Sequence, residues 1–299
     1  TLNCYSVSVS IQRIGSQPLA HQLQLESCLM VLFAFDSSIE ISTFFCIQIL
    51  VMSNLNFVIP NFVIPGYHLI EKIYDNANIQ VYRGVAEAGR KNVIIKLLNR
   101  EAASFNETIQ FQNQYAITKH LEIEGIIHPI ALFHDESLLA LVMEDIGGIS
   151  LDNYTQSQPL SLEDFFIISL QLSQILEDLD RNKIIHKDIK PQNILIEPIA
   201  KTVKLIDFSI SSLLPKQSKE SKSPNGLEGT LAYMSPEQTG RMNRAIDYRT
   251  DFYSLGVTFY ELLTGQLPFQ SIDPMEVIHS HIAKRPIPPI EQRPTLPTM

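Results

Sequence analysis

Tryptophan is absent from this chain of 299 residues, and cysteine is scarce. The three cysteines, Cys4, Cys28 and Cys46, all lie near the N terminus and lack the spacing of a metal site. They give no support for a disulfide framework, so we expect a cytoplasmic protein in a reducing compartment. The chain also lacks a long run of Lys or Arg and carries a net charge of -9. A nucleic acid partner is therefore not expected.

Residues 1–51 have few charged side chains and contain a long apolar run over 28–51. Asp36 and Glu40 interrupt this run, and each would cost about 2.5 to 3.5 kcal/mol near the centre of a bilayer. Membrane association is therefore not expected, with a membrane span as the open alternative. We interpret 1–51 as an apolar N-terminal leader, a fragment of something larger or an artefact of an upstream start, because a soluble composition begins at Met52.

Short β patterns begin at Tyr67. The stretches "YHLIEKIY", "IQVYRGVA" and "KNVIIKLL" are rich in Ile, Val and Tyr, and polar turns separate them. They predict an antiparallel meander. "NETIQFQNQYAITKHL" then predicts a helix, and "IALFHDE" and "LLALVMED" predict two more strands. We expect a small, mostly β lobe with one helix.

The pattern becomes helical after "GGISL". The segment "SLEDFFIISLQLSQILEDLD" opens with Ser161 and Asp164 at capping-box spacing. Its apolar residues recur at the spacing of one helix face, at Phe165, Ile168, Leu172, Ile175, Leu176 and Leu179. A further helix is predicted over "DFYSLGVTFYELLTG". These segments indicate a second, mainly helical lobe.

The segment "IIHKDIKPQNIL", residues 184–195, places several polar side chains between apolar ends. Asp188 and Asn193 lie in it, and Asp207 follows in "LIDF". Two carboxylates and an amide oxygen are hard ligands that suit Mg²⁺, which usually also binds substrate phosphates. Any one of these residues alone would be explained equally well by a polar turn.

These residues and their order resemble the eukaryotic-type protein kinases, in which H-R-D-x-K-x-x-N and D-F-G supply the same groups. The resemblance covers 66–299 and implies an α+β, two-lobed fold. The small antiparallel β lobe with one helix is expected over 66–146, and the larger helical lobe over 147–299. Because the chain stops soon after "GQLPF", we expect this lobe to be incomplete, without its last helices and without the arginine that pairs with Glu237.

By this resemblance, Asp188 accepts the proton of a substrate hydroxyl, and Lys190 holds the γ-phosphate of ATP. Asn193 and Asp207 bind Mg²⁺. Lys96, at the end of "VIIK", holds the α and β phosphates.

Other matches place the nucleotide base. Val81 is expected on one side of the adenine and Leu195 on the other. "LVMEDI" resembles the hinge strand, with Met143 at the gatekeeper position and the backbone from Glu144 to Ile146 along the adenine edge. Core packing is a second interpretation of Val81 and Leu195, compatible with the first.

"GTLAYMSPE" resembles the end of an activation segment, and Thr230 matches kinases that act on Ser and Thr. Asp251 resembles the aspartate that braces the catalytic loop, whereas His186 is expected to be a structural core residue. The polar tract from Ser209 to Gly229 predicts a flexible loop with three phosphorylation candidates, Ser218, Ser221 and Ser223.

Several positions depart from the family pattern. Tyr74, Asn76 and Ile79 replace the glycines of the nucleotide loop, which restricts the approach of the backbone to phosphates. Gln114 stands where a helix glutamate would pair with Lys96. The remaining departures are Ile94, Lys187 and Ser209.

We therefore expect a serine/threonine protein kinase that uses ATP and Mg²⁺ on a protein substrate in signal transduction. A pseudokinase or ATP-binding scaffold is the alternative, because of Gln114 and the glycine-free loop. A small-molecule phosphotransferase would not need "GTLAYMSPE", and no phospho-acceptor box of a histidine kinase is visible. The wider pattern resembles the N-terminal kinase domain of large bacterial, especially cyanobacterial, signalling kinases, which implies further signalling domains in a longer parent protein.

Overall fold

The computed structural model describes residues 64–297 apart from 101, 135–137, 158–159 and 214–228. The chain divides into two units, Thr1–Asn61 and Phe62–Met299, and every described residue belongs to the second. The apolar segment 1–51 and the phosphorylation candidates Ser218, Ser221 and Ser223 lie outside the described residues. No helix in the described part of the chain is long and apolar enough to cross a membrane.

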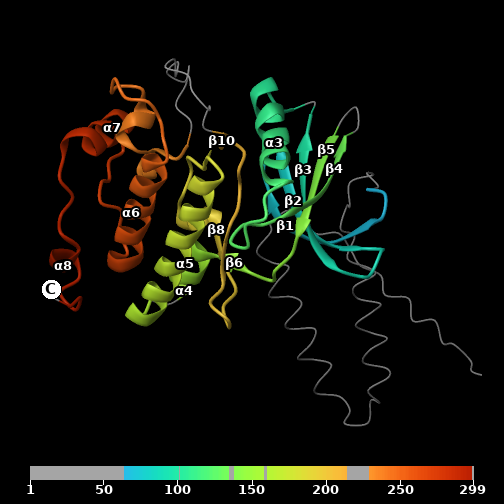
Figure 1. The fold of residues 1–299 in the computed structure, drawn as a ribbon, viewed down its shortest axis with the longest axis horizontal. Coiled ribbons are helices and arrows are strands. Elements are labelled where there is room, and N and C mark those ends of the chain that lie inside the picture. Colours follow the sequence, from blue (N-terminus) through green and yellow to red (C-terminus); the bar gives the residue numbers. More distant parts are fainter. Residues whose placement is uncertain (1–63, 101, 135–137, 158–159, 214–228, 298–299) are drawn as a thin grey trace, which may run out of the picture. The chain divides into compact units, whose positions relative to one another are not determined.

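The first lobe is a five-stranded antiparallel sheet with one helix beside it (Figure 1). Its strands follow the order β1-β2-β3-β5-β4. The elements are β1 Tyr67–Asp75, β2 Ile79–Ala86, β3 Asn92–Asn99, helix α3 Phe105–Thr118, β4 Pro129–His134 and β5 Leu138–Glu144. The predicted meander, its single helix and the two later strands are confirmed.

The alternation of side chains along β3 and β5 gives this sheet two buried faces. Val93 and Ile95 pack in one cluster with Val142, whereas Leu98 and Leu141 belong to a second cluster that includes Phe111 of α3. Because successive residues of a strand point to opposite faces, one strand supplies both clusters. The sheet therefore holds α3 firmly on one face.

Helix α3 begins at a capping box, which was not among the features predicted from the sequence. The Ser104 hydroxyl accepts a hydrogen bond from the backbone N–H of Glu107, and the Glu107 carboxylate accepts from the backbone N–H of Ser104. Two N–H groups at the helix start are thereby satisfied. Glu107 also accepts from the Asn78 amide at 2.8 Å, which ties the helix start to the β1–β2 turn.

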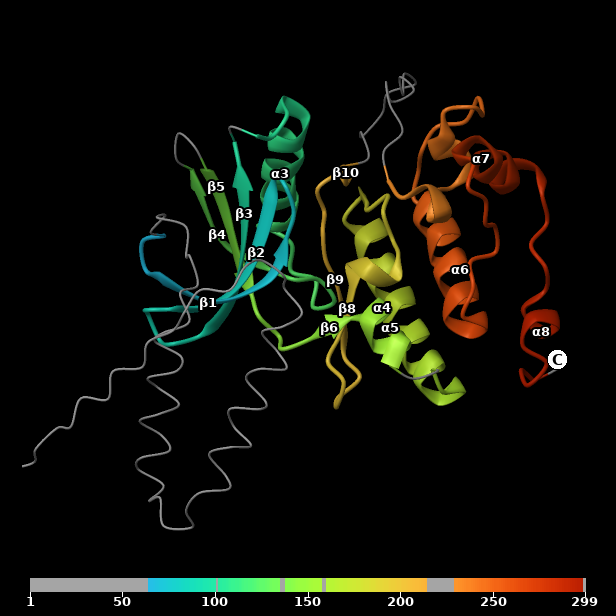
Figure 2. The same cartoon turned by 180° about the vertical axis from the view of Figure 1, so that it is seen from behind.

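The second lobe is mainly helical (Figure 2). Short strands lie next to the first lobe, and the helices follow away from it. The elements are β6 Ile149–Ser150, α4 Leu151–Ser157, α5 Leu162–Arg181, β7 Ile184–Ile185, β8 Ile194–Ile196, β9 Val203–Leu205, β10 Ser212–Leu213, α6 Arg249–Thr264, α7 Pro274–Ala283 and α8 Pro289–Gln292. The two-lobed α+β fold is confirmed.

Helix α5 is the core helix that its apolar spacing predicts. All six apolar residues of the predicted face are buried. Ser161 accepts from the backbone N–H of Asp164 at 3.0 Å, whereas the Asp164 carboxylate lies 3.5 Å from Lys201 Nζ. The Phe165 ring packs edge-on against Phe259 of α6, with 5.5 Å between ring centroids. Helices α5 and α6 thus share one core, and the strands that carry the polar loop rest on it.

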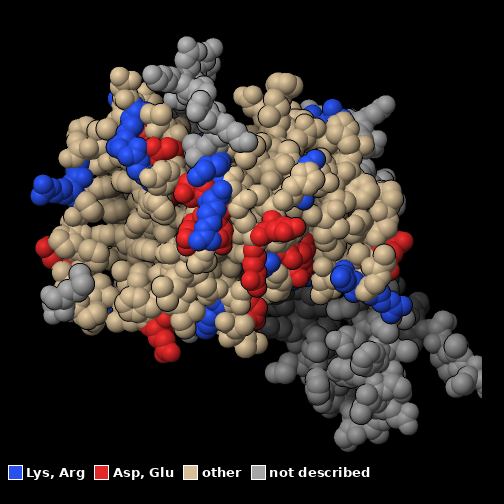
Figure 3. Space-filling view, in the orientation of Figure 1, with Lys and Arg blue, Asp and Glu red and all other residues tan. Residues whose placement is uncertain are grey.

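Charged side chains on the face seen in Figure 3 are intermixed, with acidic and basic groups close together. One acidic–basic pair joins the end of β5 to the second lobe. The Lys204 ammonium on β9 donates to the Glu144 carboxylate at 2.7 Å, and His128 lies 3.2 Å from the same oxygen. Burial raises the pKa of Glu144, but the hydrogen bonds from Lys204 and His128 outweigh it, so that pKa lies below its ordinary value.

Candidate active site

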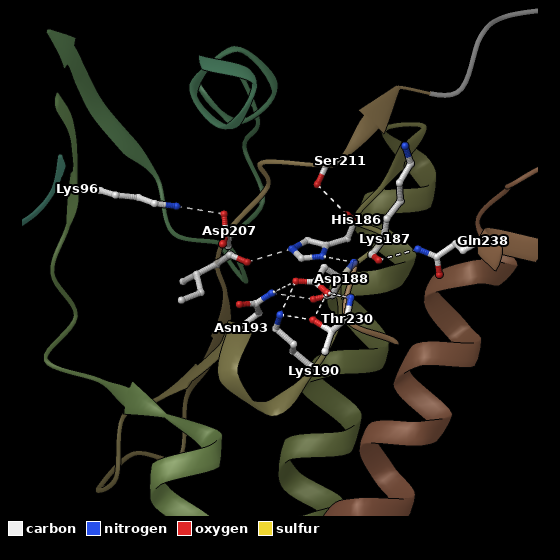
Figure 4. A network of polar contacts seen from close by, with 11 residues as sticks. Lys96, His186, Lys187, Asp188, Lys190, Asn193, Asp207, Ser211, Thr230 and Gln238 are labelled. Carbon is white, nitrogen blue, oxygen red and sulfur yellow. Dashed lines mark hydrogen bonds and ion pairs between the residues drawn. The ribbon is translucent and has the colours of Figure 1, made fainter. Parts of the chain in front are cut away.

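The polar loop lies between β7 and β8, and buried apolar residues hold both of its ends. Ile184, Ile185, Ile194 and Ile196 are at most 2% exposed. Between them, Lys187 adopts a left-handed backbone conformation with φ 72°. The side chains of Asp188, Lys190 and Asn193 point toward one another, whereas that of Lys187 points away from them (Figure 4).

The Asp188 carboxylate accepts four hydrogen bonds at the centre of this loop. Lys190 Nζ donates to Oδ2 at 2.6 Å, and Asn193 Nδ2 donates to the same oxygen at 2.8 Å. The backbone N–H and the hydroxyl of Thr230 both donate to Oδ1 at 2.9 Å. These contacts fix the carboxylate in position, and a hydroxyl of the Thr type already lies within hydrogen-bond distance of it.

Asn193 has its amide orientation set by its partners. Nδ2 donates both to the Asp188 carboxylate and to the Asp188 backbone carbonyl, at 2.8 Å each. An amide has no further donor atom, so Oδ1 is left to accept or to bind a cation. The backbone N–H of Ile206 donates to the Asn193 carbonyl at 2.9 Å, which places Asp207 beside Asn193.

These oxygens fit a hard divalent cation. In the described part of the chain, no cluster of three or more His, Cys, Asp or Glu side chains could hold a metal ion by itself. One carboxylate and one amide oxygen nevertheless suit a cation that keeps water and takes phosphate oxygens as its other ligands. Asp207 and Asn193 supply that pair.

Lys96 reaches across from β3 to the second lobe. Its ammonium lies 3.1 Å from Gln114 Oε1 on α3 and 3.2 Å from Asp207 Oδ1. The ring of Phe111 lies 5.9 Å from the same ammonium. The structure thus brings together Lys96, Gln114 and Asp207, and Gln114 occupies the position in which a helix glutamate was expected.

The electrostatics of Asp207 follow from this contact. Burial raises the pKa of its carboxyl group, but the Lys96 ammonium and hydrogen bonds from Lys96 and Ser209 outweigh burial. The pKa therefore lies below its ordinary value. Asp207 also adopts a left-handed backbone conformation with φ 65°, which Asp tolerates better than most side chains.

His186 lies in the core, as expected. Its ring is fully buried and packs edge-on against Phe208, with 4.7 Å between ring centroids. The Nε2 atom lies 3.0 Å from the Ile206 carbonyl. The backbone N–H groups of His186 and Lys187 donate to the buried Asp251 carboxylate at 2.8 Å each. Asp251 thus braces the loop.

A partly exposed apolar surface adjoins these polar groups. Ile94, Ile146 and Leu195 are half-buried and pack against the cluster that contains Met143. Val81 pairs with Lys96 in the β2–β3 register. The residues expected around adenine therefore come from β2, β3, the segment after β5, and β8. Glu144 and Ile146 lie at the crossing between the lobes.

The glycine-free turn between β1 and β2 is held by its own side chains. The Asn76 side chain accepts from the backbone N–H groups of Asn78 and Ile79 at 3.0 and 2.6 Å. An Asn side chain can replace a backbone turn in this way. Tyr74 pairs with Val81 across the turn. Asn76 thus stabilises a turn where glycines were expected.

Glu237 was expected to be left without the arginine that pairs with it in the family, and Arg293 comes too early in the chain to be that arginine. Glu237 is half-buried, and the Thr250 hydroxyl donates to its carboxylate at 2.8 Å. It lines a pocket of about 260 Å³ together with Arg244 and Arg249. Arg293 instead donates to the Leu263 carbonyl.

Three residues of the site were missed by the sequence reasoning. Ser211 donates to the His186 carbonyl at 3.1 Å, and Gln238 donates to the Lys187 carbonyl at 2.8 Å. Asn113 donates to two carbonyls beyond Asp207. All three bind backbone oxygens, which every residue carries, so no pattern of residue types could have indicated them.

Comparison with known proteins agrees with this geometry. The model of the protein kinase domain matches residues 67–298. The chain belongs to the protein kinase family, and its domain is of the serine/threonine type. Such a domain uses ATP as a substrate and a divalent metal ion as a cofactor.

Named relatives come from several bacteria. The chain is 30% identical to a probable serine/threonine-protein kinase of Clostridium perfringens, over 75% of this chain and 32% of that protein. It is 29% identical to the serine/threonine-protein kinase PrkC of Bacillus subtilis, over 72% of this chain and 33% of that protein. It is 31% identical to serine/threonine-protein kinase A of a Synechocystis species, over 68% of this chain and 41% of that protein. The matched part thus spans about a third of the length of these relatives.

Proposed function

We propose that this domain transfers the γ-phosphoryl group of MgATP to a Ser or Thr hydroxyl of a protein substrate, as a step in signal transduction in the cytoplasm. The observation that carries the proposal is the Asp188 carboxylate, held by Lys190 and Asn193 while it accepts a hydrogen bond from the Thr230 hydroxyl. A substrate hydroxyl would be recognised by the same oxygen. The scarcity of cysteine supports the cytoplasmic location.

The residues of the loop have distinct tasks. Asp188 orients the substrate hydroxyl and accepts its proton while the oxygen bonds to the γ-phosphorus. The bond from that phosphorus to the β–γ bridging oxygen breaks, and ADP leaves with this oxygen. Lys190, 2.6 Å from Asp188, stabilises the negative charge of the transferred group.

Asn193 and Asp207 would hold Mg²⁺. When bound, the cation neutralises the charge on the β and γ phosphates. Lys96 is held between Gln114 and Asp207, which supports a role for its ammonium in binding the α and β phosphates. Val81 and Leu195 would contact the two faces of the adenine, and the backbone of Glu144 and Ile146 its edge.

The test compares wild type, Asp188→Asn and Asp180→Asn in the full chain. Each is given labelled ATP, Mg²⁺ and a generic basic protein. General-base catalysis contributes about 10²–10⁴-fold, so Asp188→Asn should lose at least about 10² of the transfer rate. Asp180 lies in a surface pair with Lys183, and its variant should act like wild type.

Two outcomes decide against the proposal. If Asp188→Asn incorporates as much label as wild type, Asp188 has no catalytic role. If wild type incorporates none but MgATP raises its melting temperature, the domain is an ATP-binding scaffold.

A further inference from the structure

Helix α3 carries two neighbouring carboxamides that reach into the site. Gln114 contacts Lys96, as described above. The adjacent Asn113 donates from Nδ2 to the backbone carbonyls of Ser209 and Ser211, at 3.0 and 2.9 Å. An Asn amide has two N–H bonds, and here each has an acceptor. The helix is therefore attached directly to the segment that follows Asp207.

The Gln114 contact alone is a weak attachment for α3. Its amide is neutral, so its hydrogen bond to Lys96 is charged on one side only and lacks the attraction of a carboxylate. Asp207 binds the same ammonium at 3.2 Å, so Lys96 donates to both oxygens at once. Apolar packing on the sheet holds the body of the helix. A second polar contact next to Gln114 would fix the position of that side chain at Lys96.

The segment that Asn113 binds is itself fixed to the catalytic loop. Ser211 is 4% exposed, and its hydroxyl donates to the His186 carbonyl at 3.1 Å. The next residues form β10, which pairs with β7 at the start of the loop. A continuous set of contacts thus runs from Asn113 through Ser211 to the residues that precede Asp188. Figure 4 shows the part of it that joins Ser211 to His186.

We propose that Asn113 is a positioning residue for the phosphotransfer reaction. It holds α3 against Ser209 and Ser211, so that Gln114 stays in contact with Lys96 and Lys96 stays in contact with Asp207. The inference rests on the proposed function, because its kinetic effect is exerted on the phosphates of ATP. Asn113 replaces, with two neutral hydrogen bonds, part of the attachment that an ion pair between α3 and Lys96 would provide.

The most direct test is Asn113→Asp, which keeps the shape of the side chain. The amide group that donates to the two carbonyls becomes a carboxylate, which cannot donate and which repels the carbonyl oxygens. Two hydrogen bonds of about 0.5–1.5 kcal/mol are lost, so kcat/KM for ATP should fall roughly 10- to 100-fold. Asn106→Asp makes the same chemical change at an exposed site in the first turn of α3. A surface change of this kind should stay within about twofold of wild type.

A double-mutant cycle separates positioning from a general loss of structure. Gln114→Glu introduces a carboxylate next to Lys96 and so gives α3 the ion pair that it lacks. The loss of kcat/KM caused by Asn113→Ala should then be several-fold smaller in the Gln114→Glu background than in wild type. An equal loss in both backgrounds, or wild-type kinetics for Asn113→Asp, would overturn the inference.

Hydrogen exchange provides a readout that does not need activity. In the full chain without nucleotide, Asn113→Asp should speed amide exchange in 207–213 and in the C-terminal half of α3, whereas Asn106→Asp should not. Unchanged exchange in Asn113→Asp refutes the attachment even if the domain is inactive. Failure of the proposed function is seen separately, in wild type that transfers no label.

Discussion

The backbone N–H of His186 donates to Oδ2 of Asp251 at 2.8 Å, which joins the start of the catalytic loop to the first turn of α6. Lys187 donates to the other carboxylate oxygen at the same distance. Asp251 itself is buried, with 3% of its surface exposed. Burial raises the pKa of this carboxyl group, although the bonds from His186 and Lys187 act in the opposite direction.

Asp251→Ala should therefore destabilise the domain severely. It leaves the buried N–H group of His186 and the partly buried one of Lys187 without an acceptor. At about 1–3 kcal/mol for each such group, the free energy of unfolding should fall by up to roughly 6 kcal/mol. Asp251→Asn keeps one acceptor oxygen and should lose less. Urea unfolding of the full chain measures both, and an Asp251→Ala protein as stable as wild type would show that the brace contributes nothing.

The Lys96–Asp207 contact should make stability depend on pH. The pKa of Asp207 lies below its ordinary value of 3.8 in the folded protein, so the unfolded chain binds a proton first as pH falls. The contribution of the pair is therefore fully present above 3.8 and is lost as pH falls through the lower folded value. The unfolding free energy of wild type minus that of Asp207→Asn should decrease as pH is lowered through this range.

This difference isolates Asp207 because the other carboxylates titrate alike in both proteins. Urea unfolding at a series of pH values below about 6 gives it directly. A difference that stays constant, or that grows as pH falls, would mean that Lys96 does not favour the charged form of Asp207.

Two glycines should respond in opposite directions to alanine. A Cβ atom at Gly84 in β2 would lie 2.6 Å from the His68 carbonyl oxygen and 3.0 Å from Ile95 Cδ1. Gly84→Ala should destabilise the sheet by about 1–3 kcal/mol, because a backbone oxygen cannot move aside easily. Gly256 in α6 is exposed and has nothing within 4 Å of such an atom.

Gly256→Ala should consequently stabilise α6 by about 0.5–1 kcal/mol, since Ala loses less conformational entropy in a helix. Thermal unfolding of the two variants beside wild type checks both signs. If Gly256→Ala destabilises the domain as much as Gly84→Ala does, the steric contact at Gly84 is not the cause of the destabilisation.

Local patterns in the chain were sufficient for the elements and for most of the site. The apolar spacing from Phe165 to Leu179 predicts α5 because a helix face repeats every 3.6 residues. The start of α3 was harder to predict from the sequence. Ser104 and Glu107 have capping-box spacing, but the residues that follow them do not form a strong apolar helix face. Gln114 could be located in the sequence only by counting residues from Lys96. Its hydrogen bond with Lys96 is visible only in the folded structure.

The identity and order of Lys96, Asp188, Asn193 and Asp207 can be read along the chain, and it is their resemblance to the protein kinase pattern that indicates phosphoryl transfer. The attachments that hold these groups are of a different kind. Asn113 binds carbonyls about a hundred residues away, and Thr250 provides Glu237 with a hydrogen bond that no spacing predicts. Such partners are distant along the chain and often backbone atoms, so only the packing of the two lobes and their helices could determine them.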